Sequence, residues 1–153
     1  LLSKPSKTKK VEHHPAVPVD ELGAFVAELR KREGIAAKAL EFLILTAARS
    51  GEVREAVWSE IDFNKKVWTI PKERMKAGRE HRVPLSESAI KLLQALPRKE
   101  GSDVVFPAPR ANFLSDMSLS AVMRRMQVDA VPPRLGVGAI FVLLDHTSKL
   151  VQA

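Results

Sequence analysis

A single arginine stands where two apolar segments of the sequence meet. In the stretch LTAARSGEVREAVW, residues 45–58, an apolar run ends just before Arg49 and an amphipathic run begins at Glu52. A guanidinium enclosed between two packed helices is costly unless an acid compensates its charge. Glu52 is the nearest acid. The spacing therefore predicts a fixed positive charge that a neighbouring carboxylate holds at a helix junction.

A second concentration of charge follows in residues 65–82. Seven basic side chains stand there against two glutamates, a local excess of five positive charges: Lys65, Lys66, Lys72, Arg74, Lys76, Arg79 and Arg82. A basic ribbon is typical of a surface that contacts nucleic-acid phosphates. It is equally typical of an exposed ribbon whose charges only keep it solvated, and composition does not decide between the two.

The elements that must position the opening arginine are predicted to be helical. Apolar side chains recur at helical spacing in residues 22–29, with Asp20 as the candidate cap and Gly34 as the stop. A second helix is predicted over residues 35–46 and a shorter one over residues 52–58. The arginine of the opening stretch therefore falls at the junction of two buried helices.

The basic ribbon has the pattern of a β-hairpin. Residues 66–71 and 81–85 alternate as strands do, and we expect them to pair through a turn at Ala77-Gly78. Lys76 lies beside that turn in the sequence. The hairpin would thus present its charges on a protruding loop.

The pattern of residues 86–127 is again mainly helical. A helix over residues 86–96 is capped by Ser86 and stopped by Pro97. Residues 101–111 are expected to form a strand or a loop, and residues 118–127 a core helix with a basic edge. The fold class predicted from these patterns is mainly α with a small β-hairpin or sheet.

Composition limits the function classes. The 153 residues suit one domain, and their net charge of +7 favours an acidic polymer such as nucleic acid as partner. Cysteine is absent, which excludes disulfides and thiolate metal sites. The longest apolar run, residues 139–144, is far shorter than the ~20 residues of a membrane helix, so no membrane partner is expected.

The first 18 residues differ in composition from the rest. They combine lysines and prolines with few large apolar side chains, and we interpret them as a linker before a domain over residues 19–153. His13 and His14 are adjacent, but no third ligand stands at helical spacing from them. No metal site is expected there.

The order of the motifs resembles one family. LTAARSGEVREAVWSEID, followed by VWTIP, RMKAGREHRVPLS and VFP, is similar over residues 14–127 to the catalytic domain of tyrosine recombinases, specifically the phage-type integrases of bacterial genomic islands. The resemblance implies the fold of DNA breaking-rejoining enzymes. It also implies site-specific recombination of double-stranded DNA in the bacterial cytoplasm, through a 3′-phosphotyrosine intermediate and without metal or other cofactor.

The resemblance also implies roles for individual residues. Arg49 matches the family's first catalytic arginine, which binds the non-bridging oxygens of the scissile phosphate, and Glu52 supports it. A guanidinium suits this task because negative charge builds on two oxygens that it can bind together. Lys76 matches the hairpin lysine that protonates the departing 5′ oxygen. Contacts to DNA are expected from four other residues of the hairpin, namely Lys72, Arg74, Arg79 and Arg82. Arg82 could equally be the structural partner of an acidic residue.

The sequence departs from the family's pattern in its last part, which we interpret as aberrant from about residue 128. No His-x-x-Arg pair stands in residues 127–146, and the chain contains no tyrosine. The final LLDHTSKLVQA resembles a later histidine box, so His146 is a candidate catalytic histidine or, alternatively, a surface histidine. Either residues are lost near 131–134 and after Ala153, or the tail is an unrelated sequence joined to a decayed gene.

Two further expectations concern assembly and alternatives. The resemblance implies a tetramer on paired DNA sites for the intact protein, and a monomer or weak dimer for this fragment alone. The alternative function is a catalytically dead recombinase remnant that binds DNA without cutting it. An RNA-binding protein would explain the charge but not the order of the motifs.

Overall fold

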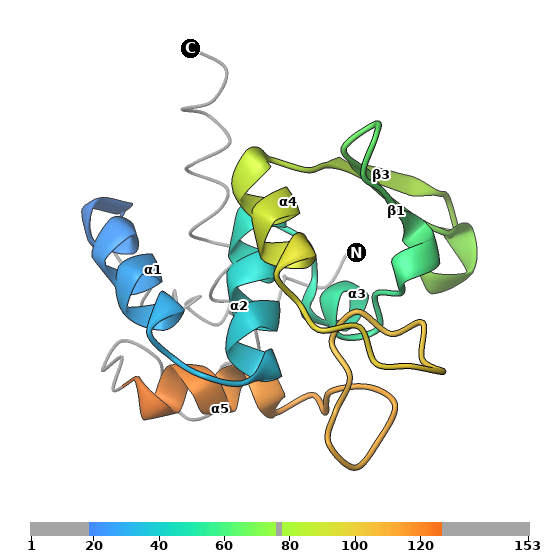
Figure 1. Ribbon diagram of the computed structural model, residues 1–153. Coiled ribbons are helices and arrows are strands. Elements are labelled where there is room, and N and C mark those ends of the chain that lie inside the picture. Colours follow the sequence, from blue (N-terminus) through green and yellow to red (C-terminus); the bar gives the residue numbers. More distant parts are fainter. Residues whose placement is uncertain (1–18, 76–77, 127–153) are drawn as a thin grey trace, which may run out of the picture.

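Helix α2, Ile35–Thr46, occupies the centre of the molecule. The computed structural model describes residues 19–75 and 78–126. Helix α1, Leu22–Arg30, lies on one side of α2 and a small sheet on the other, while helix α5, Ser118–Arg125, crosses below (Figure 1). The sequence IAAKALEFLILT is apolar at nearly every position, as expected of a helix that is enclosed on several sides. It contacts α1, α3, α4 and α5.

The first two helices differ slightly from the sequence prediction at their ends. Helix α2 has the predicted bounds. A 3₁₀ turn, η1, Val19–Glu21, precedes α1, so Glu21 occupies the cap position in place of Asp20, without a side-chain capping bond. Helix α1 ends at Arg30. Gly34, with φ +98°, is the N-cap of α2 and not the stop of α1, because glycine adopts this backbone conformation without strain.

The predicted hairpin is confirmed, and it belongs to a three-stranded antiparallel sheet. Strand β2, Val67–Ile70, pairs with β3, His81–Pro84, so that Trp68 faces Val83 across the ladder. Strand β1, Ile61–Asp62, pairs with the other edge of β2 and was not predicted. The buried Trp68 ring lies 5.3 Å from that of Phe42, centroid to centroid, and so packs the sheet on α2.

The helix predicted over residues 52–58 is wrong in its bounds. Helix α3 covers Ser50–Arg54, and a 3₁₀ turn, η2, Trp58–Glu60, follows after an extended segment. Val57 forms an antiparallel bridge with Val104, and the amide of Val105 donates to the carbonyl of Ala56 at 2.9 Å. This pairing from a distant part of the chain offers the backbone an alternative to the helix.

The later helices follow the predicted pattern. Helix α4, Glu87–Gln94, begins at Ser86, whose side-chain oxygen accepts from the amide of Ala89 at 3.2 Å. Helix α5 buries Leu119, Val122 and Met123 against the core and leaves a basic edge exposed. Residues 101–111 form isolated bridges and loop.

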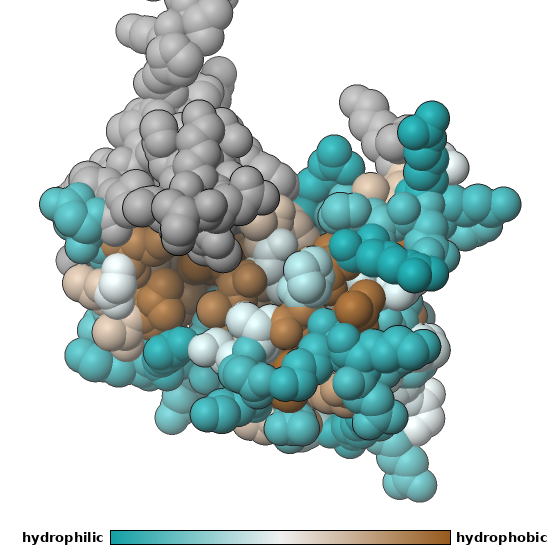
Figure 2. All heavy atoms as spheres, turned by 90° about the horizontal axis from the view of Figure 1, so that it is seen from above, coloured by the Kyte–Doolittle hydropathy of each residue, from teal (hydrophilic) through white to brown (hydrophobic). Residues whose placement is uncertain are grey.

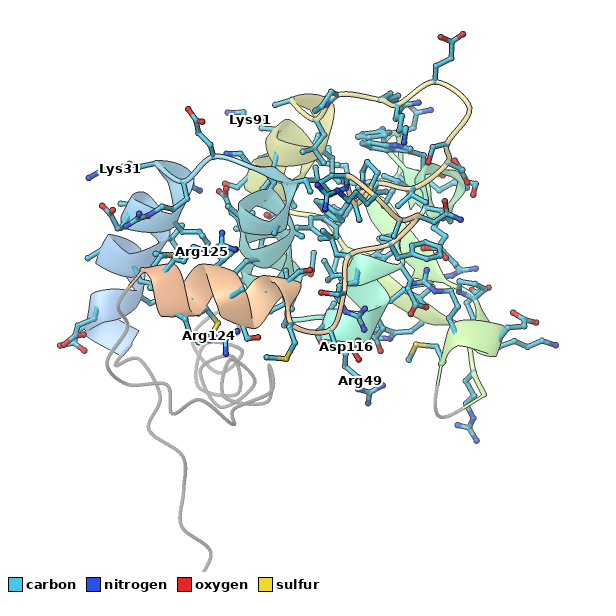
Figure 3. All side chains as sticks on the ribbon, turned by 90° about the horizontal axis from the view of Figure 1, so that it is seen from below. Lys31, Arg49, Lys91, Asp116, Arg124 and Arg125 are labelled. Atoms are coloured by element: carbon cyan, nitrogen blue, oxygen red, sulfur yellow. The ribbon has the colours of Figure 1, made fainter. Side chains whose placement is uncertain are left out.

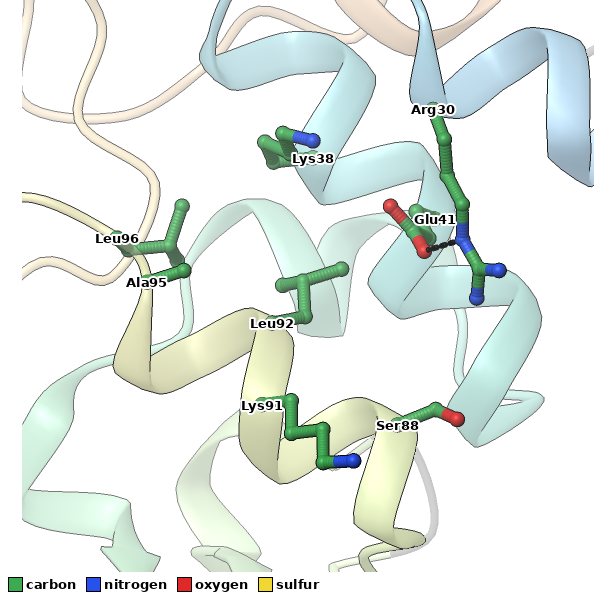
Figure 4. A pocket seen from close by; sticks show the side chains of 8 residues that line it. All are labelled: Arg30, Lys38, Glu41, Ser88, Lys91, Leu92, Ala95 and Leu96. Carbon is green, nitrogen blue, oxygen red and sulfur yellow. Dashed lines mark hydrogen bonds and ion pairs between the residues drawn. The ribbon is translucent and has the colours of Figure 1, made fainter.

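One ion pair between a half-exposed arginine and a buried glutamate joins α1 to α2. The Nε of Arg30 donates to the carboxylate of Glu41 at 2.6 Å, and the Glu41 side chain is only 8% exposed. The pair lies at the edge of a hollow of about 450 Å³ between α2 and α4, where Lys38 and Lys91 also stand (Figure 4). No helix in residues 19–75 and 78–126 has the length and apolar character needed to cross a membrane.

Candidate functional site

A tight reversal between α2 and α3 carries Arg49. The last residue of α2, Thr46, donates its hydroxyl to the carbonyl of Phe42 at 2.7 Å. Ala47 then adopts the left-handed conformation, φ +54°, which is uncommon for a residue with a side chain. Arg49 follows in extended conformation as the N-cap of α3. The predicted position of this arginine at a helix junction is confirmed.

Glu52 binds Arg49 through both carboxylate oxygens. The backbone amide of Arg49 donates to Oε2 at 2.9 Å, and Nη1 of its guanidinium donates to Oε1 at 3.1 Å. The first bond satisfies an amide at the start of a helix, as the glutamate of a capping box does. The Glu52 side chain is 9% exposed and that of Arg49 is 58% exposed. A buried carboxylate thus binds the backbone amide and one guanidinium nitrogen of Arg49, while the other guanidinium donors face outward.

The guanidinium of Arg49 extends away from the body of the protein (Figure 3). It lies on the same side as Asp116 and Arg124, and away from Lys31 and Lys91, which stand at the other end of the view. Nη1 makes the one guanidinium contact recorded for Arg49 in the described parts of the chain. The remaining N–H groups are therefore oriented to receive an external anion.

A second arginine fixes the other end of α3. The guanidinium of Arg54 donates to the carbonyl of Leu114 at 2.7 Å and forms an ion pair with Asp116, and its side chain is 14% exposed. These bonds tie α3 to the loop before α5. The sequence prediction did not include Arg54, because its partners lie about sixty residues further along the chain.

Three of the predicted hairpin contacts are exposed. The side chains of Lys72 and Arg82 are 70% and 74% exposed, and Arg79 is exposed as well. Arg82 donates to Glu80 at 2.8 Å, so it has the acidic partner that the sequence suggested as an alternative to DNA. Its side chain is nevertheless exposed. The hairpin side of the molecule is hydrophilic, in contrast to an apolar area in the middle of the same face (Figure 2).

Arg74 points inward instead. Its side chain is 18% exposed; Nη1 binds the carboxylate of Glu60, and Nη2 donates to the backbone carbonyl of Glu52 at 2.6 Å. The DNA contact predicted for Arg74 stays a prediction, but these bonds give the residue an internal role. Glu60 was not singled out from the sequence, since nothing in the order of residues shows that the two meet.

Two predicted catalytic residues lie outside the described residues, namely Lys76 and His146. The same holds for the predicted linker and for the part of the chain interpreted as aberrant. Within residues 19–75 and 78–126, no group of three or more histidine and acidic side chains is placed to hold a metal ion. The described site thus consists of Arg49, its acid Glu52, and the arginines that anchor them.

Comparison with known sequences identifies relatives. The family model described as "Phage integrase family" matches residues 17–131. The chain is 32% identical over 148 residues to the integrase of Enterobacteria phage P4, covering 86% of this chain and 34% of that protein. It is 38% identical over 100 residues to the prophage integrase IntA of Escherichia coli (strain K12), covering 65% of this chain and 22% of that protein. The chain thus spans about a third or less of the length of these relatives.

Solved structures share the fold. The Tn1549 transposon integrase in complex with a circular intermediate DNA superposes with a TM-score of 0.70 at 12% identity, over 88% of this chain and 52% of that one. XerA recombinase superposes with a TM-score of 0.68 at 14% identity, over 94% of this chain and 53% of that one. These likenesses confirm the predicted recombinase catalytic-domain fold. Since the family model matches most of its length, the chain belongs to the phage integrase family.

Proposed function

We propose that this chain forms part of the catalytic domain of a site-specific DNA recombinase. The observation that carries the proposal is the exposed Arg49 guanidinium, which a buried carboxylate holds at the start of a helix in a member of the phage integrase family. Such an arginine is prepared to bind an oxyanion in one geometry. The relatives named above are integrases, and one solved neighbour is a complex with DNA.

In the proposed reaction Arg49 binds the non-bridging oxygens of a scissile phosphate. Its charge does not titrate away, and its planar donors match two oxygens of the phosphate as negative charge develops. Lys76 protonates the departing 5′ oxygen, and His146 contributes to proton transfer at the same phosphate. A tyrosine attacks the phosphorus and forms a 3′-phosphotyrosine link as the 5′ oxygen leaves. The 5′ hydroxyl of a second DNA strand then attacks this link, rejoins the DNA and releases the tyrosine. The 153 residues contain no tyrosine, so the proposed chemistry requires one supplied in addition to this sequence.

The proposed partner is double-stranded DNA. Lys72, Arg79 and Arg82 present positive charge on the hairpin next to the helix that carries Arg49, and phosphate contacts of this kind position a protein without reading sequence. We propose that a protein that includes the attacking tyrosine assembles as a tetramer on paired DNA sites. We also propose that it acts in the bacterial cytoplasm. No metal or other cofactor takes part in the proposed reaction.

Binding of a short DNA duplex, followed by fluorescence anisotropy at several salt concentrations, tests the role of Arg49. Arg49→Ala should weaken binding about tenfold and reduce the salt slope by about one. Lys31→Ala removes a positive charge that is 74% exposed, more than that of Arg49, and that stands at the other end of the view in Figure 3, so it serves as the control. Equal effects of the two substitutions would refute a specific phosphate site at Arg49.

Strand cleavage separates a recombinase from a DNA-binding remnant. In a chain that includes the attacking tyrosine, covalent protein–DNA complexes on a nicked duplex can be counted on a denaturing gel. If Arg49→Ala and Lys76→Ala abolish the covalent complex under saturating DNA, both residues act in catalysis. If the two variants lower binding alone and the cleavage rate of bound DNA is unchanged, they contact phosphate and do no more.

A further inference from the structure

The central helix α2 has two charged side chains, and both line the hollow between α2 and α4. These are Lys38 and Glu41, in a helix whose other residues are apolar apart from its last threonine. Arg30 at the end of α1 and Lys91 on α4 line the same hollow of about 450 Å³ (Figure 4). Three positive charges therefore stand around one negative charge.

The negative charge in the hollow is already compensated. Nε of Arg30 donates to the carboxylate of Glu41 at 2.6 Å, and the Glu41 side chain is only 8% exposed. Lys38 is partly buried, and no carboxylate of the described residues forms an ion pair with it. A partly desolvated cation without an acid attracts an external anion more strongly than a fully solvated one.

Lys91 has no bound acid either. Glu87 stands one helical turn before it on α4, but the ammonium of Lys66 binds that carboxylate. Within residues 19–75 and 78–126, Lys91 takes part in no ion pair, and its side chain is exposed. The hollow thus carries an excess of two positive charges, one on each of the helices that enclose it.

One side of the hollow is apolar. It consists of Leu92 and Ala95 from α4 and its C-cap, together with Leu96. Among the described residues that line the hollow, none is aromatic, so no side chain there would stack on a nucleobase. An aliphatic group beside an anion fits this lining better than a nucleotide does.

The hollow also lies away from the proposed phosphate-binding arginine. Lys91 stands at the opposite end of the view in Figure 3 from Arg49. A DNA duplex is convex and carries its phosphates on the outside, so it does not enter a concave apolar hollow. DNA bound at Arg49 would therefore leave Lys91 accessible to another partner.

We propose that the hollow binds an acidic segment of a partner protein. An aliphatic side chain of that segment contacts Leu92 and Leu96, and carboxylates on either side of it bind Lys38 and Lys91. The volume is within the ~300–1,000 Å³ that is usual for ligand sites. The inference goes beyond the proposed recombination, because none of the residues assigned to that reaction lines the hollow.

Fluorescence anisotropy with a labelled synthetic peptide tests the proposal on the whole 153-residue chain. The probe is a short peptide of glutamates with one central leucine, and the comparison peptide has serine in place of that leucine. The leucine peptide should bind about tenfold more tightly, because its side chain leaves water in the hollow. Equal affinities, or no saturation of the leucine peptide up to about 1 mM, would overturn the proposal.

Substitutions of the two lysines locate the binding. Lys38→Gln and Lys91→Gln should each weaken binding of the leucine peptide about three- to fivefold. Lys65→Gln is the control, because it removes a charge that is 81% exposed and lies in the turn between β1 and β2, and it should change the affinity less than about 1.5-fold. Equal losses in all three variants would show general charge attraction and overturn the proposal.

Ala95→Arg separates the hollow from general charge attraction. Ala95 is exposed at the C-cap of α4, so a larger side chain is tolerated there, yet it fills the hollow while it adds a positive charge. Binding of the leucine peptide should weaken at least about fivefold, whereas tighter binding would overturn the proposal. Thermal unfolding establishes that the variant folds, and Ala95→Gln fills the same space if it does not.

Competition distinguishes the other possible occupants. A saturating DNA duplex at physiological salt should change the peptide affinity less than about twofold, since charges more than about 8 Å apart are then screened. Displacement of the peptide by the duplex, or tighter binding of ADP than of the peptide, would overturn the proposal. A dimer of the chain in sedimentation that Ala95→Arg abolishes would assign the hollow to a second copy and overturn it as well.

Discussion

The buried acid that holds Arg49 offers a quantitative test. In Glu52→Gln one carboxylate oxygen is replaced by an amide nitrogen, which is a donor. Glu52 accepts one bond from the backbone amide of Arg49 and one from its guanidinium, so the amide nitrogen must face one of these two donors. One hydrogen bond is therefore lost, and the other loses the charge of its acceptor.

The expected cost follows from the burial of the two partners. A hydrogen bond to a charged group contributes ~1.5–3 kcal/mol. The guanidinium bond contributes only about 0.5 kcal/mol, as exposed ion pairs do, because Arg49 is 58% exposed. The backbone bond to a carboxylate that is 9% exposed carries the larger share. We expect Glu52→Gln to lower the free energy of unfolding by about 2 kcal/mol and the Tm by about 6 °C.

Thermal unfolding followed by circular dichroism measures this cost. Glu55→Gln is the matched control, since Glu55 lies three residues further along, is exposed, and should tolerate the same change within about 0.5 kcal/mol. Arg49→Met removes only the guanidinium and should cost under about 1 kcal/mol. The reasoning is refuted if Glu52→Gln costs no more than Glu55→Gln, or if Arg49→Met costs as much as Glu52→Gln.

Three further outcomes are expected. Ala47→Gly should raise the free energy of unfolding by up to about 1 kcal/mol in chemical denaturation, because relief at φ +54° outweighs the added unfolded-state entropy. Ser86→Ala should lower the free energy of unfolding by about 1 kcal/mol, because α4 loses its cap. Chemical denaturation measures this change as well. A hydrogen bond from Lys66 holds the pKa of Glu87 below its usual 4.5, so this stabilisation is present above pH 4.5 and lost as pH falls through the lower folded value. Unfolding at a series of acidic pH values should therefore show a shallower decline in Glu87→Gln, and an unchanged decline would contradict the pairing.

Local patterns were sufficient to predict much of the architecture. The bounds of α2 follow from a mostly apolar run that begins after Gly34, and the hairpin follows from alternation on either side of a glycine. The bond at Ser86 and the pairing of Arg49 with Glu52 depend on residues three positions apart, a spacing that a helix start brings together.

The errors arise where distant residues meet. The end of α3 is set by the pairing of Val57 with Val104, which no window of local sequence contains. Strand β1 has two residues, too few for any period to be recognised. Charge counting placed Arg74 among the exposed cations, because composition records a charge but not its direction, and the anchored Glu60 belongs to another element.

The central place of α2 has a consequence for how the chain folds during synthesis. Helix α5 packs on α2, yet some seventy residues separate the end of one from the start of the other. Contacts of such long range delay the closing of a core and leave its apolar surface open to association in the meantime. A nascent chain that has reached the sheet but not Ser118 therefore still exposes one face of its central helix, and shortened chains that end before α5 should aggregate.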